Sequence, residues 1–186
     1  HALDLGTVPT PMVYFAQRRA GASLAAVITA SHSPPAINGL KWTIGGRPPT
    51  AADVQRLRAA VGDAFRFTVK APNSVTLTHL YREEKSEPLV ANPSFLSPFL
   101  MRTFIDLLSP LHDVLGPLMF QFEYLNRQKM ASQDAFQEQM ADFVRQLPEG
   151  CVYAVEVRNG QYMNPAYFQF LNDQALIPVL LQGYWM

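Results

Sequence analysis

The residues best suited to chemistry near the amino terminus lie in one short polar loop. Residues 29–35 read Thr-Ala-Ser-His-Ser-Pro-Pro, and Lys41 follows shortly after. The loop comes directly after an apolar, β-forming run, and its two prolines stiffen the backbone. A serine held in this way can accept a phosphoryl group while a nearby histidine or lysine moves a proton. Ser31, His32 and Lys41 are therefore candidate catalytic residues, and an ordinary turn is the alternative.

A second set of polar residues falls at the ends of strand-like segments later in the chain. These segments are Phe65–Lys70, Leu118–Tyr124, Val152–Arg158 and Ile177–Gln182. Side chains alternate between the two faces of a strand, and one parity of each segment is apolar. In the second segment the apolar parity consists of Phe120, Phe122 and Tyr124. We expect the apolar parity to pack against helices and the polar parity to meet at the carboxyl-terminal mouth of a barrel.

The polar parity would bring charges of both signs together at that mouth. Its members are Lys70, Gln121, Glu123, Glu156, Arg158 and Gln182. Because buried charges must be paired, one interpretation is a structural network of ion pairs and hydrogen bonds. The other is a site in which Glu123 or Glu156 is the general base and the remaining residues bind a ligand. His79 lies in residues 71–96, which lack clear periodicity and form either a surface excursion or a lid over this site.

Strands that alternate with helices must position these side chains. Helical patterns begin at Ser97-Pro98, near Ser132 and at Asn164-Pro165, each with a capping residue. Such alternation predicts parallel strands joined by right-handed crossovers. The expected fold class is therefore α/β, with mostly parallel strands that form part of a (β/α) TIM-type barrel.

The first part of the chain has a different order of expected strands and helices, which predicts a βαβ fragment. Strands are expected at residues 2–5, 24–30 and 41–44, and a helix is expected from Thr10 to Ala20. A second helix is expected at a capping box whose members are Thr50 and Asp53. We place the boundary between the two parts near Gly62–Ala64 and expect domains at residues 1–62 and 63–186.

Composition limits the partners of the chain. Among 186 residues the 15 basic and 15 acidic side chains cancel, and nucleic acids require concentrated positive charge, so we expect no nucleic-acid binding. The single cysteine, Cys151, forms no internal disulfide, and four scattered histidines offer no zinc spacing. No apolar run approaches the ~18–20 residues that span a bilayer. We expect a cytoplasmic protein without membrane contacts, cut from a longer chain at both ends.

Residues 1–62 resemble the amino-terminal region of the α-D-phosphohexomutases, which include phosphomannomutases and phosphoglucomutases. The resemblance rests on Val-Pro-Thr-Pro at residues 8–11, on the loop around Ser31 and on Ile-Gly-Gly at residues 44–46. It implies that Ser31 is a phosphoserine that exchanges phosphate with a hexose phosphate and helps hold Mg²⁺. It also implies that Lys41 is a general acid/base and that His32 supports the site. Because no Asp-Gly-Asp metal loop follows and residue 33 is serine where the family usually has asparagine, we expect no complete mutase in this chain.

Residues 63–186 are similar to the YecE-like family, also known as domain of unknown function 72. The segments that carry the similarity are Phe65–Pro72, Phe120–Asn126, Tyr153–Asn159 and Ile177–Met186. The resemblance implies a TIM-type barrel with a pocket, but it implies no reaction. Its extent implies that the first two and last two strands of the barrel are missing. We expect the resulting open sheet edges to favour self-association.

Three hypotheses about function follow. The leading one is a YecE-like barrel fragment that binds a small polar or phosphorylated ligand at the strand ends, through Lys70, His79, Gln121, Arg158 and Gln182. The alternative is phosphoryl transfer on hexose phosphates through Ser31, with Mg²⁺ as cofactor. The third is an inactive fusion or fragment. Whether the chain is an enzyme stays open at this point.

Overall fold

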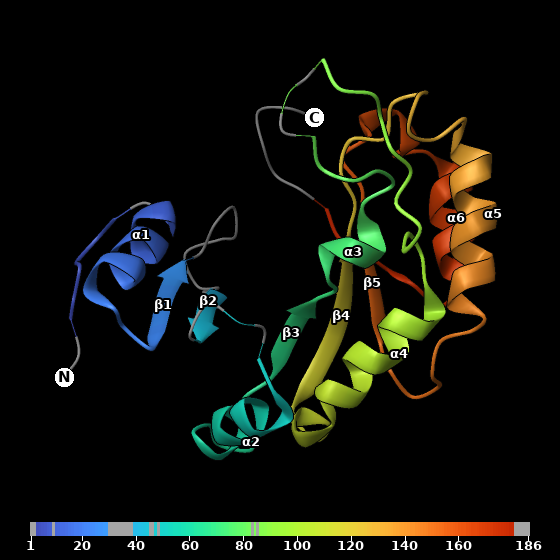
Figure 1. The fold of residues 1–186 in the computed structure, drawn as a ribbon. Coiled ribbons are helices and arrows are strands. Elements are labelled where there is room, and N and C mark those ends of the chain that lie inside the picture. The colour runs from blue at the N-terminus through green and yellow to red at the C-terminus, as the bar shows by residue number, and fades with distance from the viewer. Residues whose placement is uncertain are drawn as a thin grey trace. The chain divides into compact units, whose positions relative to one another are not determined.

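A computed structural model describes residues 3–8, 10–29, 39–44, 47, 49–82, 84 and 86–180 (Figure 1). The chain divides into two compact units, His1–Asp53 and Val54–Met186, and each is described here by itself. None of the helices in the described ranges is long and apolar enough to cross a membrane.

The first unit holds one helix and a pair of strands. These are α1 (Thr10–Ala20), β1 (Leu24–Thr29) and β2 (Gly39–Ile44). The two strands pair in antiparallel register, with Val27 opposite Lys41. The helix and the strand that follows it are found as predicted, but residues 3–5, where the first strand was expected, are not in a strand. The antiparallel pairing of β1 and β2 agrees with the short connection between them, because parallel pairing needs a crossover of about a dozen residues or more.

The predicted capping box at the start of helix α2 (Ala51–Ala59) is confirmed. The Thr50 N–H donates to Asp53 Oδ2 at 2.8 Å, and the Asp53 N–H donates to Thr50 Oγ1 at 3.4 Å. Arg47 Nη1 and the Thr50 hydroxyl also donate to the Asp53 carboxylate, both at 2.7 Å. The bond from Arg47, followed by those from Thr50, lowers the pKa of Asp53 below its ordinary value.

The second unit is built on one parallel sheet with the strand order β3-β4-β5-β6. Its strands are β3 (Phe67–Lys70), β4 (Leu115–Gln121), β5 (Tyr153–Glu156) and β6 (Ile177–Pro178). Its helices are α3 (Asn73–Thr76), α4 (Pro98–Leu107), α5 (Gln133–Val144) and α6 (Pro165–Asp173), with short 3-10 turns at Ser109–Leu111 and Gly160–Tyr162. This alternation confirms the predicted α/β class. Consecutive parallel strands that lie next to each other are the arrangement of successive β/α units in a barrel.

Each long helix of the second unit begins at the residue that the sequence indicates. Ser97 Oγ accepts from the Leu100 N–H, Ser132 Oγ from the Ala135 N–H, and Asn164 Oδ1 from the Tyr167 N–H. Each bond satisfies one of the N–H groups that a helix start leaves without a backbone partner. The caps therefore fix where each helix starts after the loop that precedes it.

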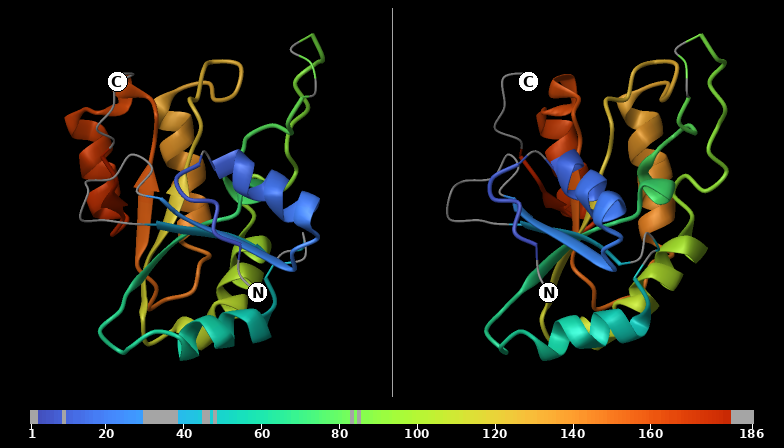
Figure 2. Two further views of the ribbon diagram at one scale, coloured as in Figure 1. Left: turned by 90° about the vertical axis from the view of Figure 1, so that its left-hand side faces the viewer. Right: turned by 60° about the vertical axis from the view of Figure 1, so that its left-hand side comes forward.

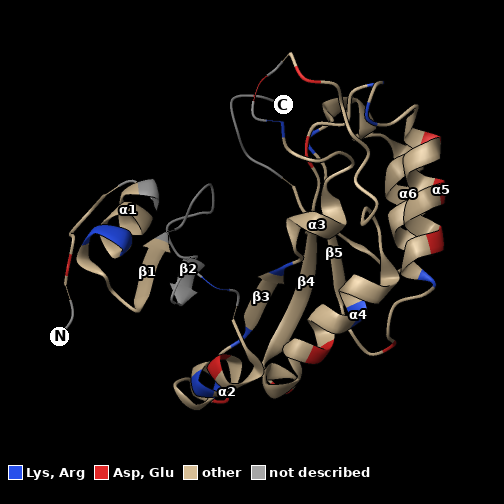
Figure 3. Ribbon diagram, viewed as in Figure 1, with Lys and Arg blue, Asp and Glu red and all other residues tan. Residues whose placement is uncertain are grey.

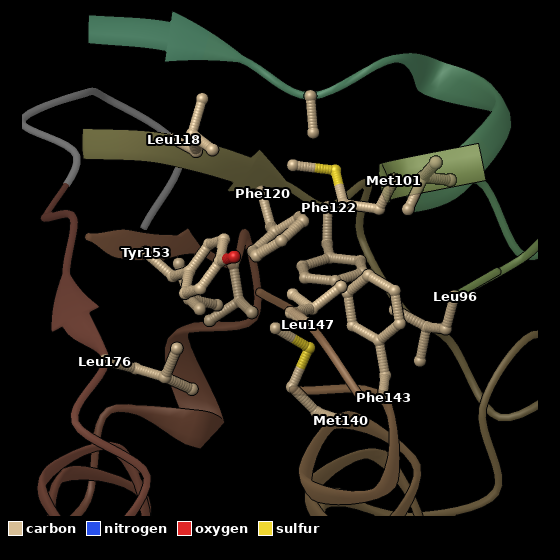
Figure 4. Close-up of a cluster of buried hydrophobic side chains, with 14 of the residues drawn as sticks. Leu96, Met101, Leu118, Phe120, Phe122, Met140, Phe143, Leu147, Tyr153 and Leu176 are labelled. Carbon is tan, nitrogen blue, oxygen red and sulfur yellow. The ribbon is translucent and has the colours of Figure 1, made fainter. Parts of the chain in front are cut away.

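The core of the second unit lies between the sheet and helix α5. Leu118 and Phe120 of β4 are completely buried, and so is Phe122, which follows directly after the strand. Phe120 meets Phe143 of α5 edge-on at a centroid distance of 5.3 Å (Figure 4). Phe122 meets Phe136 of α5 edge-on at 5.0 Å. This geometry is the favoured one for aromatic pairs. The apolar parity of β4 therefore faces the helices, as predicted.

Tyr124 is the exception to this parity. We expect it to face the helices with Phe120 and Phe122, but 53% of it is exposed. The pairing of β4 ends at Gln121, so the strict alternation of a strand no longer applies three residues later.

Candidate functional site

Three polar side chains meet at the carboxyl ends of adjacent strands. Lys70 Nζ donates to Gln121 Oε1 at 3.2 Å, and Gln121 Nε2 donates to the two oxygens of Glu156 at 2.8 and 3.0 Å. The register explains their proximity, because Gln121 lies opposite Glu156 and Lys70 lies opposite Met119, two residues before Gln121. Successive parallel strands lie about 4.8 Å apart, a gap that these side chains can bridge. The structure thus brings Lys70, Gln121 and Glu156 together as predicted.

The amide of Gln121 separates a cation from an anion in this row. Its oxygen faces the Lys70 ammonium and its nitrogen faces the Glu156 carboxylate, so both ends of the amide have the partner they require. Glu156 is only 3% exposed. Within the described ranges Gln121 is the one hydrogen-bond donor to the Glu156 carboxylate, which has room for about four. Glu156 therefore keeps acceptor capacity for a further donor.

A second cluster surrounds Glu123, just beyond the end of β4. The Thr78 hydroxyl donates to Glu123 Oε1 at 3.1 Å, and Lys129 forms an ion pair with Glu123 Oε2. Both charged side chains are about one-fifth exposed, at 22% each. The pair is therefore partly shielded from water while one edge stays accessible.

His79 joins this cluster through Thr78. Its Nδ1 lies 2.9 Å from Thr78 Oγ1. Because the Thr78 hydroxyl already donates its proton to Glu123, we assign Nδ1 of His79 as the donor in this contact. In the neutral imidazole this leaves Nε2 without a proton and able to accept one. The order His79–Thr78–Glu123–Lys129 is thus a continuous hydrogen-bonded row.

The loop after β4 is held by two asparagines. The Asn126 side chain accepts from the Gln128 and Lys129 N–H groups at 3.0 and 3.1 Å and so shapes the turn that carries Lys129. Asn159 is completely buried, and its amide donates to the Leu125 carbonyl and accepts from the Leu125 N–H, both at 2.8 Å. Asn159 follows β5, so it ties the loop after β4 to the loop after β5.

A third asparagine fixes the segment that carries His79. Asn92 is 9% exposed and donates to the carbonyls of Ser74 and Leu77 at 2.9 and 2.7 Å. Residues 78–92, called the arm below, close on themselves through the Leu80 N–H to Val90 O bond at 2.9 Å. The arm extends past the carboxyl ends of the strands (Figures 1 and 2).

A cleft of about 320 Å³ opens between the arm and the loop after β4. Its lining combines charged, polar and apolar side chains: Leu77, His79, Leu80, Tyr81, Arg82, Glu84, Leu89, Glu123 and Lys129. Figure 3 shows a basic residue at the carboxyl end of β3 and residues of both charges in the loops beyond the strands. The second cluster therefore faces a cavity at the edge of the sheet where parallel α/β folds place their ligands.

The remaining predicted site residues are not part of these clusters. Arg158 follows β5, is exposed, and forms no hydrogen bond or ion pair with the described part of the chain. Ser31, His32 and Gln182 lie outside the described residues. Lys41 belongs to β2, but the position of its side chain is not described. Over the described ranges, no three His, Cys, Asp or Glu side chains are grouped so that they could hold a metal ion.

Sequence reasoning missed several residues that build the site. Thr78 and Lys129 hold Glu123, and Asn92 and Asn159 hold the loops. A signal existed for Asn159, because it follows directly on the polar end of a strand segment. The other three lie in aperiodic stretches, where spacing carries no information about contacts.

The chain matches two family models in stretches that overlap at residues 47–65. The model described as "Protein of unknown function DUF72" matches residues 47–183. The model described as "Phosphoglucomutase/phosphomannomutase, alpha/beta/alpha domain I" matches residues 1–65. Both resemblances inferred from the sequence are therefore confirmed.

Curated relatives include mutases that match part of the chain. A probable phosphoglucosamine mutase of Thermococcus kodakarensis is 39% identical over 71 residues, which are 38% of this chain and 15% of that protein. A phosphoglucomutase of Neisseria gonorrhoeae is 41% identical over 59 residues, which are 32% of this chain and 13% of that protein. The chain thus spans less than a sixth of the length of these relatives.

Among solved structures, a DUF72 family protein of Thermotoga maritima is similar, with a TM-score of 0.49 and 22% identity. The similarity covers 71% of this chain and 45% of that chain. Because the first of the two family models matches well over half of the sequence, the chain belongs to the DUF72 family of proteins of unknown function.

Proposed function

We propose that the second unit binds a small polar ligand at the carboxyl ends of its parallel strands. The observation that supports this most directly is the row His79–Thr78–Glu123–Lys129, which lines a cleft beyond β4. A purely structural ion pair requires neither a neighbouring imidazole with an open nitrogen nor an adjoining cavity. Convergent polar groups beside apolar side chains in a concave site are typical of small-molecule binding.

Each group of the row has a defined capacity toward a ligand. Glu123, held by Thr78 and Lys129, accepts hydrogen bonds from hydroxyl or amine groups. Nε2 of His79 accepts a proton or a hydrogen bond, so His79 is the residue of the cleft best suited to general base chemistry. Glu156, one strand away, binds Gln121 and keeps acceptor capacity for a ligand that extends from the cleft toward the strand ends.

The test is a binding measurement with a panel of polar ligands. We would follow thermal unfolding and calorimetric titration with neutral hexoses, hexose phosphates, inorganic phosphate and amino acids. At least one ligand should raise the melting temperature, and Glu123→Gln and Glu156→Gln should each reduce its affinity about tenfold or more. Glu138→Gln, an exposed glutamate of α5, is the matched control and should have no effect.

Three results would contradict the proposal. The first is a panel in which no ligand changes the melting temperature. The second is binding that survives both substitutions at full affinity. The third is an equal loss of affinity in Glu138→Gln. Any of these would leave the polar clusters as a structural network and favour an inactive fragment.

A second candidate function is phosphoryl transfer on hexose phosphates through Ser31. It is supported by the match of residues 1–65 to domain I of the phosphoglucomutase/phosphomannomutase family and by the mutase relatives. In this proposal residues 1–62 act as a unit, with Ser31 as the phosphoserine and His32 and Lys41 as its supporting groups. The described residues offer no group of metal ligands, so no step is assigned to Mg²⁺.

Phosphoprotein mass spectrometry tests this second candidate. After incubation with glucose 1,6-bisphosphate and Mg²⁺, the chain should gain one phosphoryl group at Ser31, and Ser31→Ala should remain unmodified. Ser33→Ala is the matched control in the same loop and should still be modified. A chain that stays unmodified, or a label that persists in Ser31→Ala, would refute phosphoryl transfer through this serine.

A further inference from the structure

Tyr81 is an exposed aromatic residue whose hydroxyl is fixed. Its side chain lines the cleft beside Glu123, and 78% of the residue is exposed. Asn73 Nδ2 donates to Tyr81 Oη at 3.3 Å. The backbone next to it is pinned by the Leu80 N–H to Val90 O bond and the Asn92 N–H to Thr78 O bond, at 2.9 and 3.0 Å. The hydrogen bond and the paired backbone reduce the conformational entropy that the Tyr81 ring loses when it contacts a ligand in the cleft.

Among the described residues that line the cleft, the charges around Tyr81 cancel. Two acidic side chains, Glu84 and Glu123, and two basic ones, Arg82 and Lys129, line the cleft. Lys129 is paired with Glu123, and Arg82 Nη1 donates to the Glu87 carbonyl at 2.8 Å. A ligand of one charge sign would therefore meet like charges as well as opposite ones. This balance favours a neutral ligand.

The hydrogen-bonding groups of the cleft are of mixed type. Glu123 accepts, Lys129 donates, and Nε2 of neutral His79 accepts. A hydroxyl group both donates and accepts, so a ligand with several hydroxyls can satisfy this mixture whatever its orientation. The apolar side of the lining comes from Leu77, Leu89 and the ring of Tyr81.

We propose that the cleft binds a neutral polyhydroxylated ring, such as a pyranose sugar, whose C–H face stacks on Tyr81 while its hydroxyls reach Glu123 and His79. The inference rests on the proposed function and names the class of its ligand. The volume of about 320 Å³ is at the small end of ligand pockets, which suits a ligand with one ring. A flat aromatic ring would also stack on Tyr81, but it would offer the carboxylate few donors.

Saturation-transfer NMR of the full chain tests this proposal. The probes are glucose, mannose, galactose and N-acetylglucosamine, with adenosine, glycine and inorganic phosphate as competitors. We expect at least one sugar to receive saturation at its ring C–H protons. Tyr81→Ala should weaken its binding about tenfold, equivalent to about 1.4 kcal/mol. Tyr81→Phe, which keeps the ring, should weaken it less.

Two further variants separate this inference from the proposed function. Phe99→Ala removes another exposed aromatic ring, 74% exposed and outside the cleft, and should leave sugar binding unchanged. Glu123→Gln should weaken sugar binding about tenfold or more. If sugar binding depends on Glu123 but not on Tyr81, the site stands and the stacking is refuted.

Other outcomes overturn the ligand class. If glycine, phosphate or adenosine binds in a manner sensitive to Glu123→Gln while no sugar binds, the site stands and the sugar inference is wrong. If no probe receives saturation and none changes the melting temperature, both proposals are wrong.

Discussion

Asn159 offers a test of how the loops at the strand ends are held. Its side chain is completely buried and satisfies both backbone groups of Leu125, which is itself 2% exposed. Asn159→Ala removes both partners at once. A buried backbone group left without a partner costs about 1–3 kcal/mol, so the two together should cost about 2–6 kcal/mol of unfolding free energy. That is a large share of the stability of an ordinary domain.

Urea denaturation followed by circular dichroism measures this loss. The midpoint should fall with little change in slope, because the surface exposed on unfolding stays nearly the same. Asn172→Ala, at an exposed position of α6, is the matched control and should stay within about 0.5 kcal/mol of the parent. The loop after β4 also carries Glu123 and Lys129, so ligand affinity should fall in Asn159→Ala although Asn159 does not line the cleft. A variant as stable as its control would refute the role of Asn159 as a tie between the two loops.

Further predictions concern acid stability, the core, the strand-end row and association. The folded-state pKa of Asp53 lies below its ordinary value of 3.8, so the stability that the Asp53 carboxylate contributes is complete above about pH 3.8 and is lost as the pH falls further. Asp53→Asn should therefore flatten the acid limb of a plot of urea midpoint against pH. An unchanged acid limb would contradict this. Phe122→Ala should cost about 3–5 kcal/mol in the same denaturation assay, because the ring is fully buried against α5, and a loss below about 1 kcal/mol would be inconsistent with this packing. Gln121→Leu should leave the Glu156 carboxylate without its donor and cost about 1–3 kcal/mol of unfolding free energy. The double variant with Glu156→Met should recover part of that free energy, and no recovery would mean that the two residues are not coupled. Sedimentation velocity should reveal concentration-dependent association through the sheet edges, whereas a monomer at all concentrations would exclude it.

The order of helices and strands in the second unit could be predicted from the sequence, because caps and strand alternation are local patterns. Ser97, Ser132 and Asn164 sit directly before proline or apolar helical patterns, and each is a cap in the structure. The alternation of Phe120 and Phe122 with Gln121 assigns the faces of β4 without knowledge of its neighbours. Polar side chains that lie on the same face at the carboxyl ends of these strands then come together, because neighbouring parallel strands end at the same edge of the sheet.

The contacts of the second cluster could not be predicted, because they depend on loops. Thr78 and Lys129 reach Glu123 from 45 and six residues away, through an arm and a turn that have no periodicity. Tyr124 shows the limit of the strand pattern, since the expectation based on alternation fails as soon as the strand ends. The antiparallel pairing of β1 and β2 was accessible in principle from the length of the connection between them.

We propose that polar side chains at the ends of β3, β4 and β5, together with the arm, form one ligand site. Amide-resolved NMR of the ¹⁵N-labelled chain, titrated with whichever probe stabilises it, tests this claim most directly. We expect saturable shift changes concentrated at His79, Tyr81, Glu123 and Lys129 and at the strand ends around Gln121 and Glu156, with the outer surface of α5 unaffected. Shift changes that are scattered over the second unit, or confined to residues 10–44, would contradict it.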